Sequence, residues 1–188
     1  MKSITKISVS LEGITPIMFD RYIGMTGQEV APEQKFYLGR DGKTITLPSV
    51  NISSFLSADL TESATKRVMG KKWRGVAKAA LSYVNISPID IPLTRDGEPR
   101  TLDNSEYTVD RRTARVKKSG GLIVPSEKVR PVIADPWAIN FDVTLFENPE
   151  LNEPTLKRIF DEGGISIGLG TFRGVFGKFR VAKWEIDK

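Results

Sequence analysis

Alternating apolar and polar residues predict strands near both ends of the chain. In residues 4–12, isoleucine, valine and leucine alternate with polar side chains, which is the period of a strand with one buried face. The same alternation recurs in residues 137–146, and a last strand is expected from 178 to about 186. We therefore expect three strands in these segments, of which the first is half-buried.

Apolar residues spaced three and four apart predict helices in three places. The clearest lies at about 71–84, where an apolar stripe runs beside a separate basic face. A second helix is expected to start near Ser49, a possible N-cap. A third begins at Pro154, and the pair Gly163 and Gly164 is expected to end it.

The long stretch from 94 to 136 contains few large apolar residues. Strand-like segments at 107–118 and 122–132 flank a Ser-Gly-Gly turn, a pattern typical of a hairpin. Because long insertions of this kind in a compact domain are usually functional, we expect a finger that projects from the body. Another strand, interrupted by prolines, is expected at 86–93.

The expected order is strand, helical region, strand, long insertion, strand, helix and strand. This order predicts an α+β fold with a ferredoxin-like βαββαβ core and an inserted basic β-hairpin finger. We expect a single domain over residues 1–188, with the finger at 94–136. Helices would cover one face of the sheet. Phe146, Phe172 and Phe179 lie near the strands, where packing in the core is their expected role.

Composition excludes several classes of chemistry. The 188 residues include no histidine and no cysteine, which removes Ser-His and Cys-His catalysis, disulfides and cysteine zinc sites. Carboxylate-held metal chemistry, acid–base chemistry by lysine or tyrosine, and binding without catalysis remain open. No apolar stretch is long enough for a signal peptide or a membrane span, so we expect a cytoplasmic protein without a membrane partner.

The positive charge is concentrated in two segments. Residues 65–80 carry a net charge of +6 and residues 110–130 carry +5, which leaves −6 for the rest of the chain. An acidic body with two strongly basic segments is the charge pattern of a nucleic-acid-binding protein, which neutralises phosphates and releases counterions. The alternative is that both segments are ordinary solvated surfaces.

A glycine-rich run follows the last predicted helix. Gly168 and Gly170 precede Arg173 and Lys178, and the run stands before a strand rather than before a helix. It is therefore not a dinucleotide-binding fingerprint. Backbone N–H groups in such a loop can approach a phosphate, with the two cations adding charge. Alternatively, the glycines only satisfy the backbone geometry of a tight connection.

The run at 165–181, ISIGLGTFRGVFGKFRV, resembles the C-terminal glycine-rich loop of the RAMP superfamily, the repeat-associated proteins of CRISPR effectors. It also looks like the ending of small phage-encoded proteins. The resemblance implies a ferredoxin-like fold and a finger that acts as a thumb, reaching a neighbouring protomer across bound RNA. The chain is shorter than typical backbone subunits. It also lacks the histidine that many RNA-processing members use, so repeat-RNA cleavage of that kind is not expected.

The resemblance also draws attention to Asp20. Some backbone subunits of target-RNA-cutting complexes carry a metal-dependent aspartate in the loop after the first strand, where Asp20 lies. Metal catalysis usually needs several oxygen ligands, and a single carboxylate in a loop more often forms a cap or a turn.

The leading hypothesis is non-catalytic, backbone-directed binding of single-stranded nucleic acid, RNA or DNA, without a cofactor or metal. The protein would assemble along the strand as a homo-oligomer or as a subunit of a nucleoprotein complex. A metal-dependent nuclease that uses Asp20 is one alternative, and a module that docks acidic protein partners through the finger is another. The expected nucleic-acid-binding residues are Lys71, Arg74, Lys78, Arg111, Arg112, Arg115, Lys117, Lys118, Gly168, Gly170, Arg173 and Lys178.

Overall fold

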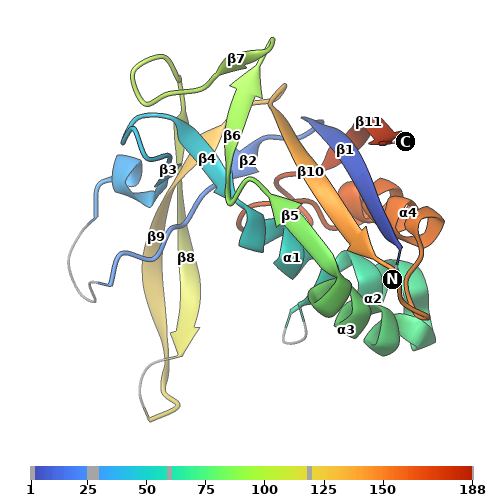
Figure 1. Ribbon diagram of the computed structural model, residues 1–188. Helices are drawn as coiled ribbons and strands as arrows, with labels where there is room; N and C mark the ends of the chain where they lie inside the picture. The colour runs from blue at the N-terminus through green and yellow to red at the C-terminus, as the bar shows by residue number, and fades with distance from the viewer. Residues whose placement is uncertain (1–2, 25–29, 59–60, 118–119, 188) are drawn as a thin grey trace.

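The protein is a mixed α+β structure whose strands pair antiparallel in a larger and a smaller sheet (Figure 1). The computed structural model describes residues 3–24, 30–58, 61–117 and 120–187, without the side chains at 114–117 and 126. The α+β class expected from the sequence is confirmed by this architecture.

The larger sheet is built around the first strand. In spatial order its strands are β11 (Phe179–Ile186), β1 (Ile4–Gly13), β10 (Ala138–Phe146), β6 (Asp90–Arg95), β4 (Ile45–Pro48) and β3 (Tyr37–Leu38). β5 (Val84–Ser87) also pairs with β10, and β7 (Glu98–Pro99) pairs with β6. Val9 lies opposite Phe141 on one side and Trp184 on the other. The alternation predicted for residues 4–12 places Ile7, Val9 and Leu11 in the core, while Ile4 at the start of the strand is exposed.

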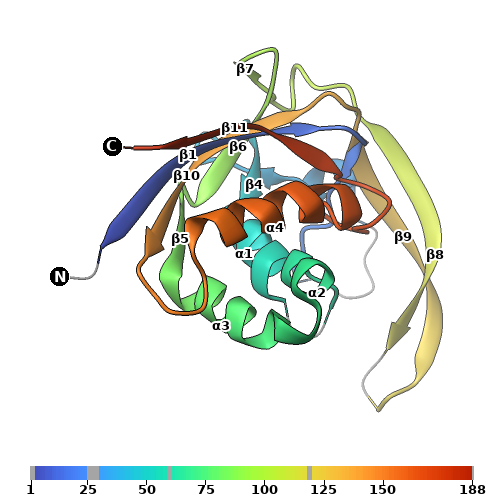
Figure 2. The same cartoon turned by 90° about the vertical axis from the view of Figure 1, so that its right-hand side faces the viewer.

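Helices cover one face of this sheet (Figure 2). They are α1 (Ser49–Ser57), α2 (Ala64–Met69), η2 (Gly70–Lys72), α3 (Trp73–Tyr83) and α4 (Glu153–Ser166), whereas the short η1 (Pro32–Lys35) contacts β9 (Ile123–Ile133). Phe55 of α1 contacts Phe160 and Phe179, with ring centroids 5.6 and 5.5 Å apart, which joins helices and sheet through buried aromatic area. Among the described residues, no helix is both long and apolar enough to cross a membrane.

The predicted finger is a long antiparallel hairpin of β8 (Thr108–Lys117) and β9 (Ile123–Ile133). With β2 (Ile17–Met18) it forms the smaller sheet, and both views show the hairpin extending away from the body (Figures 1 and 2). Ile17 pairs with Ile133 and Met18 with Val132, so β2 ties the base of the finger to the segment that follows β1.

The predicted end of the last helix is wrong. α4 continues through Gly163 and Gly164 to Ser166, because both glycines are buried where the helix approaches its neighbours closely. A Cβ at Gly163 would lie 2.9 Å from Phe55 Cζ, and one at Gly164 would lie 2.7 Å from the carbonyl oxygen of Phe179. The glycines are thus packing residues rather than a C-cap.

Two other boundaries differ from the sequence prediction. The strand expected at 86–93 is divided into β5 and β6, which Pro88 separates. Proline has no N–H to donate to a strand ladder, which favours a break at this position. At the start of α1 the N-cap residue is Pro48, and no side chain caps this end, so Ser49 is the first helical residue rather than the cap.

Substituting alanine for Gly164 is expected to lower the free energy of unfolding by about 1–3 kcal/mol, because the added Cβ collides with backbone and ring atoms of Phe179. Urea denaturation measures the effect. Gly75→Ala in α3 is the matched control, since its Cβ would meet only the end of the flexible Glu150 side chain at 3.0 Å. The control is expected to be neutral or to stabilise by up to about 1 kcal/mol through helix propensity. Equal effects of the two substitutions would contradict the packing role of Gly164.

Candidate nucleic-acid interface

The glycine-rich loop, residues 167–178, folds back tightly on itself. Gly168 and Gly177 have φ angles of +78° and +71°, which a side chain would strain. A Cβ at Gly168 would lie 2.6 Å from the Gly177 carbonyl oxygen, and one at Gly177 would collide with the carbonyl of Leu169. The loop therefore needs glycine at these positions for close approach of backbone to backbone.

Its glycine N–H groups are already engaged within the protein. The amide of Gly168 donates to the Gly163 carbonyl at 3.2 Å, and that of Gly170 donates to Asn51 Oδ1 at 3.0 Å. Gly174 and Gly177 donate to other carbonyls. These bonds fit the alternative in which the glycines serve the backbone geometry, so phosphate contacts at this loop would come from its side chains.

Arg173 lies at the tip of the loop and is half-buried. Its guanidinium donates to Thr61 Oγ1 at 3.1 Å, and burial lowers the pKa of Arg173 from its ordinary value. Among the described residues, none of the ion pairs includes Arg173. A partly desolvated cation without a carboxylate partner is a site that an anion would stabilise.

Thr61 connects this arginine to the helical basic segment. Its carbonyl accepts a hydrogen bond from Lys66 Nζ at 2.8 Å. The Lys66 ammonium lies 4.7 Å from the centre of the Trp73 ring, and the Arg74 guanidinium lies 5.5 Å from it. The first basic segment of the sequence thus reaches the loop tip through consecutive contacts.

On the other side, the loop tip contacts the finger. The Arg112 guanidinium lies 5.2 Å from the ring centre of Phe172 and 5.6 Å from that of Phe176. Asp110 Oδ2 accepts from Arg112 Nε at 2.7 Å. We call the residues linked by these contacts, Arg74, Trp73, Lys66, Arg173, Phe172 and Arg112, the basic track. It joins the two basic segments, which are distant in sequence.

Other predicted residues lie outside the basic track. Lys71 and Lys78 are exposed on η2 and α3 and belong to no ion pair among the described residues. Arg111 is paired with Glu127 at 3.9 Å. Lys178 contributes its amide to Thr15 Oγ1 at 2.9 Å. Three further predicted residues fall outside the part of the structure that is described: the side chains of Arg115 and Lys117, and the whole of Lys118.

Lys66, Trp73 and Thr61 belong to the site although the sequence did not predict them there. Lys66 lies in the first basic segment, so its charge was visible, but no local pattern places it beside the loop tip. Trp73 fitted the apolar stripe of the helix. Its place between two cations depends on the turn formed by η2 between α2 and α3.

Asp20 is held between two cations at the base of the finger. Its Oδ2 accepts from Arg130 Nε at 2.8 Å, and its Oδ1 accepts from Lys35 Nζ at 3.2 Å. Burial raises the pKa of Asp20, but the hydrogen bonds from Arg130 and Lys35 outweigh it and leave that pKa below its ordinary value. Within the described ranges, no three acidic residues gather in one place as metal ligands. This geometry favours a role for Asp20 in positioning the finger.

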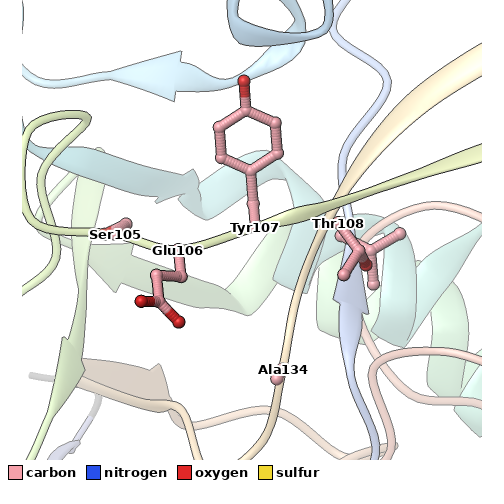
Figure 3. Close-up of a pocket in the computed structure, with 6 residues that line it drawn as sticks. Ser105, Glu106, Tyr107, Thr108 and Ala134 are labelled. Carbon is pink, nitrogen blue, oxygen red and sulfur yellow. The ribbon is translucent and has the colours of Figure 1, made fainter.

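A shallow cleft of about 520 Å³ lies beside the base of the finger, lined by Ser105, Glu106, Tyr107, Thr108, Val132 and Ala134. Figure 3 shows the Glu106 carboxylate and the Tyr107 ring pointing to opposite sides of the chain. The Tyr107 hydroxyl donates to Glu33, and this bond raises the pKa of Tyr107 to about 12. Tyr107 is therefore unsuited to acid–base chemistry at neutral pH, and none of the described residues that line the cleft carries a positive charge.

Replacing Asp20 with asparagine is expected to lower the free energy of unfolding at neutral pH by about 3 kcal/mol, because Arg130 and Lys35 stay buried without a counter-charge. Because the pKa of folded Asp20 is lowered, its contribution is present above the ordinary value of 3.8 and is lost as the pH falls below it. The difference in the free energy of unfolding between the unaltered protein and Asp20→Asn, measured by urea denaturation, should therefore become smaller in acid.

Asp161→Asn is the matched control, since Asp161 pairs with Lys157 on the exposed face of α4. Loss of an exposed pair is expected to change the free energy of unfolding by at most about 0.5 kcal/mol. An Asp20→Asn protein as stable as this control would show that the ion pairs of Asp20 do not fix the finger.

No protein-family model matches the chain, and no curated protein matches it in sequence. A similar solved structure is a chain of the "Cryo-EM structure of the Type III-B Cmr-beta bound to cognate target RNA". The TM-score is 0.54, with 18% sequence identity and 98% of this chain covered. The match spans 61% of that chain, so this chain corresponds to about three fifths of its length. At this identity the likeness shows the fold: the chain shares its fold with a subunit of that RNA-bound assembly.

Proposed function

We propose that the protein binds single-stranded nucleic acid, and RNA in preference to DNA, through the phosphate backbone and without cleaving it. The observation that carries this proposal is the basic track. Cations from α2, α3, the glycine-rich loop and β8 meet there through contacts that no single segment could supply. A continuous line of cations with interleaved aromatic rings suits a flexible polyanion that exposes its bases.

Charge pairing supports the same function. Some surface cations have carboxylate partners, such as Lys157 with Asp161 on α4 and Arg112 with Asp110 within the basic track. Arg74 and Arg173 enter none of the ion pairs among the described residues. Charges left uncompensated on one surface of an otherwise acidic body attract an anionic ligand.

The fold supports RNA as the ligand and an assembly as the setting. The pairing of β11 with β1, of β1 with β10 and of β10 with β5, with α1–α3 and α4 in the connections, supports a ferredoxin-like βαββαβ core. We assign the chain such a core with the finger inserted at 94–136, as in a relative of the RAMP superfamily. The similar chain belongs to an assembly bound to target RNA. We propose that this protein is likewise a subunit of a nucleoprotein complex, either with copies of itself or with other chains.

The proposal that the protein binds without catalysis rests on the ion pairs of Asp20, the candidate metal ligand. Both oxygens of Asp20 are occupied by cations, so the residue would have to lose two ion pairs before it could bind Mg²⁺. No observation on the described residues favours the nuclease alternative over this positioning role.

We expect the affinity for a labelled single-stranded RNA to fall steeply as the salt concentration rises. In a plot of the logarithm of the binding constant against the logarithm of the salt concentration, each phosphate contact that is removed should make the slope shallower by about 0.7. The triple variant Lys66→Gln, Arg74→Gln, Arg173→Gln should therefore bind more weakly and with a slope shallower by about 2. Fluorescence anisotropy at several salt concentrations, with RNA and DNA strands of the same sequence, measures both quantities.

The matched control removes three cations that already have partners. Lys157, Arg158 and Lys183 pair with Asp161, Glu162 and Glu185, so their replacement by glutamine should leave the slope nearly unchanged. Equal slopes for the two triple variants would contradict the basic track as the binding surface. Absence of binding to any strand by the unaltered protein would favour the alternative in which the finger docks an acidic protein.

A further inference from the structure

Phe172 is an exposed aromatic residue held in a strained backbone conformation. Its side chain is 45% exposed and its φ angle is +56°, a region that residues other than glycine rarely occupy. Such conformations persist where the surrounding structure fixes them, and they concentrate at functional sites. Here the hydrogen bond from the Phe176 amide to the Phe172 carbonyl and the bond from the Gly174 amide to the Ile167 carbonyl hold the turn.

The ring of Phe172 contacts two neighbouring side chains. Phe176 lies 6.2 Å away between ring centres, and the Arg112 guanidinium lies over both rings. Arg112 is itself oriented by Asp110, whose other carboxylate oxygen is buried without a hydrogen-bond partner. The largely buried carboxylate of Asp110 thus holds the Arg112 side chain of the finger against the loop tip.

Packing in the core does not account for this arrangement. Phe179, from the same glycine-rich region of the sequence, is fully buried and contacts Phe55. Phe172 instead ends in the basic track, beside Arg173 and against Arg112. An aromatic face that is presented among cations suits a ligand with both a π surface and a negative charge.

We propose that Phe172 is a stacking platform for one unpaired base of the bound strand, and that Arg112 is the positioning residue that holds its ring. The inference rests on the proposed function and adds a base contact to it. Stacking on an aromatic ring tolerates every base, because each base has a π face, so it would raise affinity without selecting a sequence. Arg173 is next to the ring in sequence, where it can neutralise the phosphate of the stacked nucleotide.

The test compares a labelled oligouridylate with an abasic strand of the same length. The unaltered protein should prefer the strand with bases by about 5-fold or more, the contribution of a stacked base. Phe172→Ala should lose this preference and bind both strands as the unaltered protein binds the abasic one. Phe172→Trp should keep the preference, because indole also stacks.

Phe146→Ala is the matched control, because Phe146 is also an exposed phenylalanine, at 38%, at the end of β10 and outside the basic track. It should keep the preference of the unaltered protein. Arg112→Lys retains the charge but loses the planar guanidinium, so it should reduce the base preference while leaving the salt dependence nearly unchanged.

Two results would overturn the inference while leaving the proposed function standing. One is binding by the unaltered protein with no preference for bases. The other is a Phe172→Ala protein that weakens equally toward both strands, as a purely structural role for the ring would produce. If the unaltered protein bound neither strand, the proposed function itself would fail.

Discussion

The contact between the glycine-rich loop and β2 is the constraint on which the candidate interface depends. The amide of Thr171 donates to the carbonyl of Met18 at 2.9 Å, and that of Gly177 donates to Pro16 at 2.7 Å. Met18 also pairs with Val132 at the base of the finger. One short strand therefore holds the loop on one side and the finger on the other. A Cβ at Gly170 would lie 2.7 Å from the same Met18 carbonyl, so this contact requires glycine.

This constraint explains how a protein that is acidic outside its two basic segments presents those segments together on one surface. With loop and finger fixed to the same strand, Phe172 and Arg112 meet, and Arg173 reaches Thr61 beside the helices. The cations need not be neighbours in sequence, because the fold brings them into line. The ion pairs of Asp20 with Arg130 and Lys35 add a second attachment at the finger base. Asp20, which the sequence offered as a candidate metal ligand, thus helps to fix the position of the finger relative to the loop.

The glycines have a different role from the one their pattern suggests. A glycine-rich loop with nearby cations is typical of phosphate binding by backbone N–H groups, yet here Gly168 and Gly170 donate within the protein. Their small size instead lets the loop fold tightly enough to project its tip. Gly163 and Gly164 act in the same way inside α4, where the predicted helix end is replaced by close packing against Phe55 and Phe179. In both places the glycines allow close approach.

The sequence by itself determined the strands at 4–12 and 137–146, the finger and the basic face of α3, because local alternation and helical spacing depend on neighbours a few residues apart. It also located the charge in two segments and excluded histidine and cysteine chemistry. Three features became visible only in the folded protein: Lys66 and Arg173 meet at Thr61, Asp20 is paired with two cations, and Phe172 is exposed while Phe179 is buried. These outcomes depend on contacts between residues far apart in the chain, for which local periodicity carries no information.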